Sequence, residues 1–230
     1  MADPGPRRDD PELLVVADRV TMVLGAGGAR TEVIDDATFS VEAGDRISIA
    51  GPSGSGKSTL LHLIAGISPA LTGTITWPAL GSVTELRPGR ISIAFQGPSL
   101  MAPLSLLENV ALPLLLVGVA ESEARDEAAA MLDRFGLLDQ SERLPEELSG
   151  GQMQRGGVAR ALVGRPRLIL ADEPTGQSDH ATAVRVVDTL LETADALGSA
   201  LVIATHDQSV TARMERRWTV RDRVLEVGTI

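Results

Sequence analysis

The chain has 230 residues, of which 43% are hydrophobic and 2% aromatic, with no cysteine and a formal net charge of −10. This size and hydrophobic content suffice for one α/β domain with its own core, and the missing cysteines exclude disulfides, thiolate metal sites and cysteine nucleophiles. The acidic charge and the shortage of aromatic side chains argue against nucleic acid as a partner.

Residues 1–12 are rich in Pro, Arg and Asp and predict a mobile tail, because such a segment has little to bury. No apolar segment of the signal-peptide type follows Arg7 and Arg8. The longest strongly apolar run, residues 111–120, is far shorter than the ~20 residues that a membrane-spanning helix requires. We therefore expect one domain over residues 13–230 that does not itself cross a membrane.

The first informative pattern is a strand, a glycine-rich loop and a helix. Residues 45–50 predict a strand, residues 51–56 read GPSGSG, and residues 57–65 have apolar side chains at helical spacing. With Lys57 and Ser58 the loop gives the full phosphate-loop pattern, in which backbone N–H groups and a helix N-terminus face phosphate oxygens. We expect Lys57 to reach the β- and γ-phosphates and Ser58 to bind Mg²⁺. The alternative, a glycine-rich turn that binds nothing, is disfavoured by this context.

Farther along, residues 90–95 predict a strand, and helical character follows over residues 97–163. Two short continuous apolar runs, 168–171 and 200–204, are typical of strands buried on both faces of a parallel sheet. The remaining expected elements are a helix over residues 121–135, a crossover helix over residues 184–196 and a hairpin over residues 217–227.

Two carboxylates follow the first of these apolar runs. Asp172 and Glu173 should lie at the carboxyl edge of the sheet, where open α/β sheets bind their ligands. We expect Asp172 to hold Mg²⁺, mostly through water, and Glu173 to orient and polarise an attacking water. An alternative is that the pair caps the helix that follows Pro174, and the two roles are compatible.

A second anion-binding helix start is predicted at residues 148–152, which read LSGGQ. A serine and two glycines ahead of a helical run present free backbone N–H groups. Because one phosphate loop does not need a second such element, we interpret residues 149–152 as a cradle for a nucleotide held by another subunit.

Together these motifs resemble the ABC ATPase family over about residues 13–227. Their order is GPSGSGKS at 51–58, Gln96 after a strand, LSGGQMQR at 148–155, LILADEP at 168–174, TGQSD at 175–179 and ATHD at 204–207. The resemblance implies an α/β fold: a P-loop NTPase core with a mainly parallel sheet, an N-terminal antiparallel β portion and a helical subdomain. The implied core comprises residues 13–95 and 164–230, and the helical subdomain about 97–163.

The resemblance also implies roles for single residues. Gln96 would contact Mg²⁺ and the attacking water, and Asp179 would lie at the seam of a dimer. His206 would touch the γ-phosphate, and its place after an apolar strand supports a functional role, whereas His62 and His180 have no such support. The implied catalytic residues are Lys57, Gln96, Glu173 and His206; the nucleotide contacts are Leu24, Gly51, Pro52, Ser53, Gly54, Ser55, Gly56, Lys57, Ser58, Thr59, Ser149, Gly150, Gly151, Gln152 and Asp179; the metal ligands are Ser58, Gln96 and Asp172.

By the same resemblance, the chain would bind ATP with Mg²⁺ and power an ABC transporter by ATP-driven dimer closure. Its partners would be a transmembrane permease subunit and a second copy of itself or a paralogous ATPase, with no nucleic acid, in the cytoplasm on the inner face of the cell membrane. An alternative is an ABC ATPase driving a non-transport membrane signalling complex of the cell-division or cell-wall type. An inert nucleotide-binding subunit is disfavoured by Glu173 and His206.

The direction of transport stays open at this point. Residues 172–176, DEPTG, resemble ATPases of the lipoprotein-release and macrolide-export type. The short segment between Lys57 and Gln96 is instead similar to that of importers of small anions. Residues 96–119 should carry the groove for a helix of the membrane partner. Its candidate lining residues, each of which has ordinary core as the alternative, are Leu100, Met101, Leu104 and Leu106.

Two positions depart from the family pattern. Leu24 stands where an aromatic side chain usually stacks on adenine, and the chain has no tyrosine. Apolar contact from Leu24, with Val33, would replace stacking of order 1 kcal/mol, so GTP should compete better than usual. Ser178 stands where leucine is common, next to Asp179, which either loosens the dimer seam or has no effect.

Overall fold

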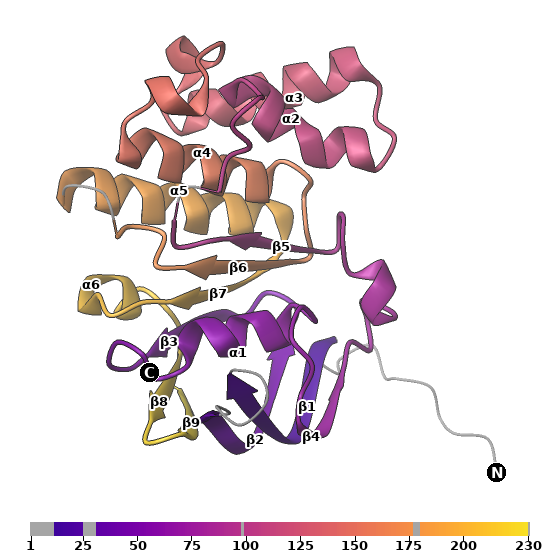
Figure 1. Ribbon diagram of the computed structural model, residues 1–230, viewed down its shortest axis with the longest axis vertical. Coiled ribbons are helices and arrows are strands. Elements are labelled where there is room, and N and C mark those ends of the chain that lie inside the picture. Colours follow the sequence, from indigo (N-terminus) through magenta and orange to yellow (C-terminus); the bar gives the residue numbers. More distant parts are fainter. Residues whose placement is uncertain (1–11, 25–30, 98, 177–179, 230) are drawn as a thin grey trace.

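The computed structural model describes residues 12–24, 31–97, 99–176 and 180–229, and within these ranges the strands form two sheets (Figure 1). The larger sheet has the order β5-β6-β7-β3-β8-β9, in which neighbours are parallel except for the last, antiparallel pair. Its strands are β3 (Arg46–Ala50), β5 (Ile91–Ala94), β6 (Leu168–Asp172), β7 (Ala200–Ala204), β8 (Arg216–Arg221) and β9 (Val224–Thr229).

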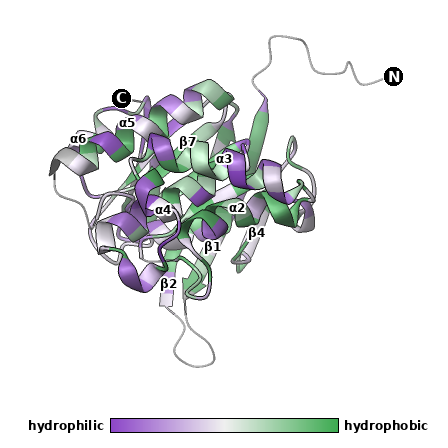
Figure 2. Cartoon of the chain, turned by 90° about the horizontal axis from the view of Figure 1, so that it is seen from above, coloured by the Kyte–Doolittle hydropathy of each residue, from purple (hydrophilic) through white to green (hydrophobic). Residues whose placement is uncertain are grey.

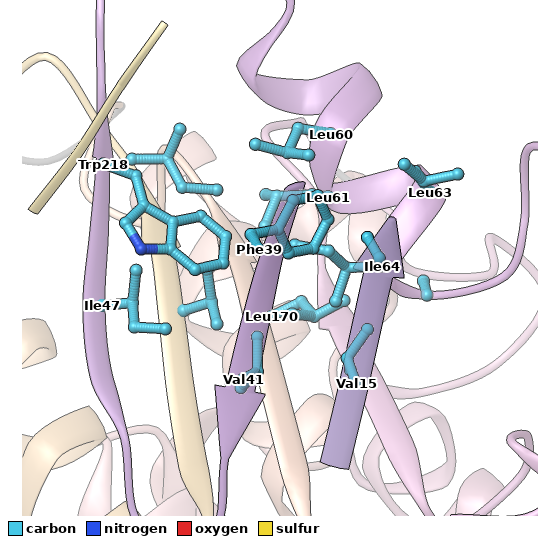
Figure 3. Close-up of a cluster of buried hydrophobic side chains, with 14 of the residues drawn as sticks. Val15, Phe39, Val41, Ile47, Leu60, Leu61, Leu63, Ile64, Leu170 and Trp218 are labelled. Carbon is cyan, nitrogen blue, oxygen red and sulfur yellow. The ribbon is translucent and has the colours of Figure 1, made fainter. Parts of the chain in front are cut away.

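The smaller sheet is antiparallel, with β1 (Leu13–Leu24) between β2 (Thr31–Glu42) and β4 (Thr72–Thr76). It packs against the main sheet through an apolar cluster that contains Phe39 of β2 and Trp218 of β8, whose ring centroids lie 5.0 Å apart (Figure 3). The buried leucines and isoleucine of the first helix fill the same cluster. The cluster therefore ties the helix that follows the glycine-rich loop to both sheets.

Most of the helices lie on the other side of the main sheet (Figure 1). One of them buries Ala124, Ala128 and Leu132, which are spaced four residues apart and give it one apolar stripe. Figure 2 shows hydrophilic and hydrophobic residues mixed along these helices, as expected for helices with one buried face. The helices are α1 (Lys57–Ile64), α2 (Leu106–Leu116), α3 (Glu121–Arg134), α4 (Gly150–Leu162), α5 (His180–Leu197) and α6 (Gln208–Thr211), with 3₁₀ turns η1 (Val83–Glu85), η2 (Leu138–Gln140) and η3 (Pro145–Glu147).

The central strands place α1 and α4 on opposite faces of the main sheet. Strands β3, β6 and β7 are buried at every position, as strands covered on both faces of a parallel sheet should be. Alternate residues of β6 face opposite sides, so that Leu168 and Leu170 join the cluster that contains α1, whereas Ile169 and Ala171 join the cluster that contains α4 and α5.

The predicted α/β class, with a mainly parallel sheet and a separate antiparallel sheet, is confirmed. The predicted helical character of residues 97–163 is interrupted, because the segment before α2 forms turns rather than a helix. Buried Asn109 holds this segment: its Oδ1 accepts from Met101 N at 2.7 Å, and its Nδ2 donates to Leu104 O at 3.0 Å. Within the described residues, one apolar cluster joins α2, α3 and α4 to Ile169 and Ala171 of β6, and the predicted division near residues 97 and 163 stays a prediction.

Candidate functional site

The carboxyl ends of four adjacent strands bring the predicted site residues to one edge of the main sheet. Ala94 pairs with Ala171, and Asp172 and Ile49 both pair with Ala204. The residues that follow these positions are Gln96 after β5, Glu173 after β6, His206 after β7 and the glycine-rich loop 51–56 after β3. This edge is where an open parallel sheet binds its ligand.

The glycine-rich loop depends on close backbone contacts. A Cβ atom on Gly51 would lie 2.4 Å from Val220 O, and one on Gly56, which has φ 105, would lie 3.0 Å from Val33 O. Only glycine fits these two positions without displacing a neighbouring strand. The loop therefore lies close against the backbones of β2 and β8.

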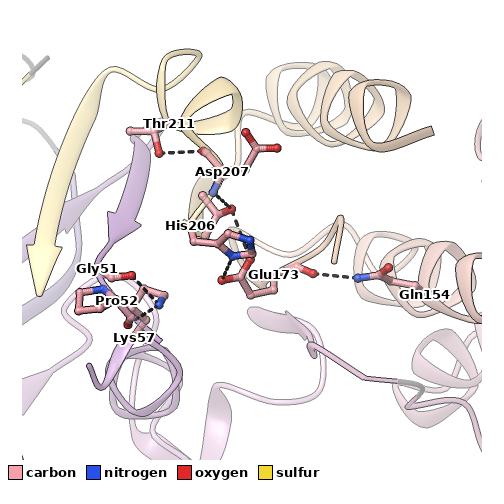
Figure 4. A network of polar contacts seen from close by, with 9 residues as sticks. Gly51, Pro52, Lys57, Gln154, Glu173, His206, Asp207 and Thr211 are labelled. Atoms are coloured by element: carbon pink, nitrogen blue, oxygen red, sulfur yellow. Dashed lines mark hydrogen bonds and ion pairs between the residues drawn. The ribbon is translucent and has the colours of Figure 1, made fainter. Parts of the chain in front are cut away.

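Lys57 folds back over this loop (Figure 4). Its Nζ donates to Gly51 O at 3.0 Å and to Pro52 O at 3.1 Å, and the residue is 7% exposed. A lysine ammonium carries three donors. Lys57 thus places a positive charge at the mouth of a loop whose backbone N–H groups lie at the start of α1, an arrangement suited to an anion.

Asp172 lies beside Ser58 with one oxygen free of hydrogen bonds. Its Oδ1 is buried and has no partner among the described residues, while the Ser58 hydroxyl bonds to the carboxyl group. Burial raises the pKa of Asp172, and Glu173 adds to this, whereas the hydrogen bond from Ser58 opposes it. A buried carboxylate oxygen next to a hydroxyl is a pair of hard oxygen ligands that fits Mg²⁺.

No cluster of three or more His, Cys, Asp or Glu side chains within the described ranges could hold a metal ion by itself. A divalent ion here would therefore depend on one carboxylate, on the hydroxyl or amide oxygens of neighbours, on water and on ligand oxygens. Mg²⁺ is typically bound in this way, through one or two carboxylates plus substrate phosphates.

Glu173 occupies a strained position at the end of β6. Its φ of 46 lies in the left-handed region, which costs a non-glycine residue of order 1–3 kcal/mol. Three hydrogen bonds hold this backbone: Glu173 N donates to Ala204 O at 2.9 Å, and Glu173 O accepts from Gly176 N at 3.1 Å and from Gln154 Nε2 at 2.8 Å. Gln154 had no predicted role, although it lies inside the LSGGQMQR motif.

The side chain of Glu173 is held from β7 (Figure 4). Its Oε1 lies 2.9 Å from Nδ1 of His206, and its Oε2 accepts from Thr205 Oγ1 at 3.5 Å. The glutamate side chain is 9% exposed, whereas the histidine side chain is 75% exposed. A buried carboxylate thus contacts an exposed imidazole ring, which is the geometry of a general base with an orienting partner.

The predicted second cradle is the N-terminus of α4. Ser149 is its N-cap, and a capping box joins Ser149 to Gln152: Ser149 N donates to Gln152 Oε1 at 2.8 Å, and Gln152 N donates to Ser149 Oγ at 3.2 Å. Ser149 is exposed, so this helix start faces outward. Because α1 and α4 cover opposite faces of the sheet, the two helix starts are separate elements of one chain.

Several predicted residues have less structural support. Gln96 is exposed just after β5. Val33 is 8% exposed in the core beside Gly56, which leaves little of it for contact with a base. Ser178, Asp179 and the side chain of Leu24 fall outside the described residues.

A groove of about 430 Å³ lies between the main sheet and α2. Its lining is mostly apolar and includes Phe95, directly before Gln96, and Leu116 of α2. None of the four residues expected from the sequence lines it; Leu106 in particular is 0% exposed, because it packs in the core against Gly156. The lining residues are Ile67, Arg87, Pro88, Gly89, Ile91, Ser92, Ile93, Phe95, Leu112, Pro113, Leu116, Arg160 and Ala161.

A search of the helices for membrane spans, confined to the residues that the structure describes, found none that is long and apolar enough. A family model described as ABC transporter matches residues 34–176. The lipoprotein-releasing system ATP-binding protein LolD of Legionella pneumophila (strain Paris) is 41% identical over 212 residues, which are 89% of this chain and 93% of that protein. An uncharacterized ABC transporter ATP-binding protein of Mycobacterium tuberculosis (strain ATCC 25618 / H37Rv), Rv0986, is 40% identical over 210 residues, 88% of this chain and 85% of its own length.

Two solved structures resemble the fold closely. The dimeric post-hydrolysis state of the ATP-binding cassette MJ0796 bound to ADP and Pi has a TM-score of 0.85 and 31% identity, covering 93% of this chain and 97% of the other. A dimeric structure of MJ0796 described as a bacterial ABC transporter cassette has the same TM-score and coverage with 32% identity. Both similar structures are therefore dimers.

Proposed function

Because this chain belongs to the ABC transporter family of ATP-binding subunits, we propose that it works as one half of a dimer that closes on two ATP molecules and opens on hydrolysis. The observation that carries this proposal is the separation of two anion-binding helix starts, at Lys57 and at Ser149, on opposite faces of the sheet. A nucleotide on the loop of one subunit would be completed by Ser149 of the partner subunit, which is the second copy or a paralogue.

Each predicted residue has a task in this scheme. We propose that Lys57 leaves the loop carbonyls to meet the β- and γ-phosphates, and that Glu173 accepts a hydrogen bond from the attacking water and orients it. Ser58, Asp172 and Gln96 would hold Mg²⁺, which neutralises phosphate charge when it is bound. His206, which is exposed and contacts Glu173, would steady the carboxylate and reach the γ-phosphate.

We further propose that the groove beside α2 receives a helix from a transmembrane permease subunit, which holds the chain on the inner face of the membrane. Phe95 lines the groove directly before Gln96, so an occupant would contact the segment that leads into the nucleotide site. The relatives named as lipoprotein-releasing ATPases, which are 36% to 41% identical, favour a partner complex of that export type over an importer of small anions.

The charge of the groove indicates which kind of side chain its occupant should carry. In a chain with a net charge of −10, none of the described lining residues is acidic, and two of them are arginines. Arg87 donates to Ala65 O, and Arg160 donates to Ser99 O at 2.8 Å. Burial lowers the pKa of both guanidinium groups. We propose that the docked helix is amphipathic and carries a carboxylate that meets Arg87 at the groove rim.

The dimer scheme can be tested by cross-linking, because the cysteine-free chain makes engineered cysteines unambiguous. Ser53→Cys in the loop and Ser149→Cys at α4, combined in one chain, should give dimers with a short bismaleimide only when ATP is present. Each single variant, and a pair that combines Ser149→Cys with Ser82→Cys at the N-cap of η1, serves as a control. A nucleotide-independent yield, or no dimer at all, would contradict the scheme.

A further inference from the structure

A buried amide connects the helix that begins at Ser149 to the backbone of Glu173 in the same chain (Figure 4). Gln154 lies in the second turn of α4, is 4% exposed and donates from Nε2 to the backbone O of Glu173 at 2.8 Å. The same helix begins at Ser149, which is exposed. One rigid helix therefore contacts the strained residue of its own site and carries the outward-facing cradle.

The bond fixes a feature of Glu173 that the strand alone does not dictate. At the left-handed φ of 46 the backbone turns sharply away from β6. Such a strained conformation persists only where several surrounding contacts hold it in place. Two of the three backbone bonds of Glu173, to Ala204 and Gly176, come from the sheet edge and from the turn that follows. Gln154 supplies the third from a different layer of the fold.

The packing of α4 leaves little freedom at this contact. A Cβ on Gly156 would lie 2.5 Å from a methyl carbon of Leu106, and one on Gly157 would lie 3.3 Å from Ser99 Oγ. Glycines at these two positions let α4 approach its neighbours closely. A shift of the α4 N-terminus would therefore move Gln154, and with it the backbone of Glu173, because both belong to one packed unit.

We propose that Gln154 is a positioning residue for hydrolysis, which ties the helix end that bears Ser149 to the backbone of Glu173. The inference rests on the proposed function, since it requires that Glu173 acts on water and that the α4 N-terminus faces a second subunit. When a nucleotide on the partner subunit contacts the N-terminus of α4, this contact sets the orientation of Glu173, which acts on the nucleotide bound by its own chain. Loss of the bond should slow the chemical step while leaving nucleotide binding in place.

The test compares two changes that remove the donor and keep the size of the side chain. Gln154→Met replaces the amide with an unbranched apolar chain, and Gln154→Leu replaces it with a branched one, so that neither side chain has a donor. Met153→Leu on the same turn is the matched control. We expect kcat to fall about five- to tenfold in both Gln154 variants, with KM for ATP within about twofold of wild type, as the loss of one buried hydrogen bond would give.

Two further measurements do not depend on turnover. Hydrogen exchange of the Glu173 amide in the nucleotide-free chain should be about tenfold faster in Gln154→Met and unchanged in Met153→Leu. In the Glu173→Gln background, ATP-dependent dimer formation should persist when Gln154→Met is added. Failure of Glu173→Gln alone to dimerise would count against the dimer scheme and not specifically against Gln154.

Three results would overturn the positioning role. One is a wild-type kcat in either Gln154 variant. Another is an unchanged exchange rate at Glu173. The third is loss of the ATP-bound dimer only when Gln154→Met is added to Glu173→Gln, because Gln154 would then serve the closure of the dimer rather than the position of the carboxylate.

Discussion

The Nδ1 atom of His206 lies 2.9 Å from Oε1 of Glu173, although the two residues are far apart in the chain. The contact follows from the pairing of β6 with the adjacent parallel strand β7, in which Asp172 lies opposite Ala204. Glu173 follows Asp172 directly, and His206 lies two residues after Ala204. Thr205 bonds to the other carboxylate oxygen. The end of β7 thus contacts both oxygens of the carboxylate that follows β6, and the position of this carboxylate depends on the pairing of the two strands.

Glu173→Gln should keep the shape of this contact and remove the carboxylate. We expect hydrolysis to fall at least about 10²-fold, the lower end for loss of a general base, while ATP still closes the dimer. Light scattering during size-exclusion chromatography in Mg-ATP should then report a stable dimer. A monomer at saturating Mg-ATP would refute the dimer mechanism.

Lys57→Ala should abolish measurable ATP hydrolysis and weaken nucleotide binding. Among the described residues, Lys57 is the cation that Gly51 and Pro52 hold at the loop, and the variant has no replacement for its charge. The fold should survive, since in the part of the chain that the structure describes the ammonium bonds to two loop carbonyls alone. Turnover assays and equilibrium dialysis with ATP measure the two effects, and the far-UV circular dichroism spectrum provides the control. Unchanged hydrolysis would remove the phosphate-site assignment.

Asp172→Asn should raise the thermal stability of the metal-free chain and reduce the stabilisation that Mg-ATP gives. Burial raises the pKa of Asp172 in the folded chain, so the folded chain holds the carboxyl proton more tightly than the unfolded chain does. This difference stabilises the folded chain at low pH, and the stabilisation is lost as pH rises through the raised pKa of Asp172. In EDTA at pH 7, the variant should therefore melt at a higher temperature than wild type. The difference should vanish below about pH 3, where the carboxyl group is protonated in both states.

Mg-ATP supplies the second arm of the Asp172→Asn experiment. Wild type should gain thermal stability with Mg-ATP, since a ligand that binds only the folded state stabilises it, and Asp172→Asn should lose most of this gain. Calorimetry over a pH series, with and without Mg-ATP, measures both arms. A variant that melts below wild type in EDTA at pH 7 would show that the ionised carboxylate is not a burden in the metal-free chain.

Local sequence pattern was enough for the central elements. Continuous apolar runs identified β6 and β7, and the glycine-rich loop located the start of α1, because each signal lies within one segment. The turns before α2 could not be foreseen, since they depend on Asn109 reaching back to Met101 and Leu104 after α2 has packed. Likewise, the predicted hairpin near residues 217–227 is present as β8 and β9, but its parallel pairing with β3 is a long-range contact.

The site shows the same division. Lys57, Asp172 and Glu173 could be found from motifs because their chemistry follows from residues next to them in sequence. Gln154 could not, because its partner is a backbone oxygen that only the packing of α4 on the sheet brings within 2.8 Å. The burial of Leu106 could not be predicted for a similar reason: Leu106 is apolar and near Gln96 in sequence, and the close approach of α4 at Gly156 buries it.

Nucleotide selectivity provides a prediction from sequence alone. With leucine at position 24 and no tyrosine in the chain, stacking of order 1 kcal/mol on adenine would be lost, which corresponds to about fivefold in affinity. GTP should therefore compete with labelled ATP within about tenfold of unlabelled ATP, and Leu24→Tyr should restore a wider gap. Many-fold weaker binding of GTP to the unchanged chain would contradict this prediction.

Docking at the groove should depend on the charge of Arg87. If an acidic side chain of the membrane partner meets this arginine, Arg87→Glu places two carboxylates together in an apolar groove, and like charges in such a place cost several kcal/mol. Arg223→Glu, on the β8–β9 hairpin, makes the same change in net charge where Arg223 pairs with Glu32 at 3.0 Å, and it is the matched control. The fraction of each variant that sediments with membranes of cells expressing the chain measures docking.

Arg87→Glu should be released from those membranes at about 150 mM salt, whereas wild type and Arg223→Glu remain bound. The contrast should widen at low salt, because screening weakens repulsion between groups near the rim more than apolar contact in the groove. Equal retention of all three chains would mean that Arg87 meets no carboxylate, and the groove would then bind its partner by apolar contact alone. That outcome would leave the dimer mechanism untouched, since no residue of the groove rim takes part in the proposed grip on the triphosphate.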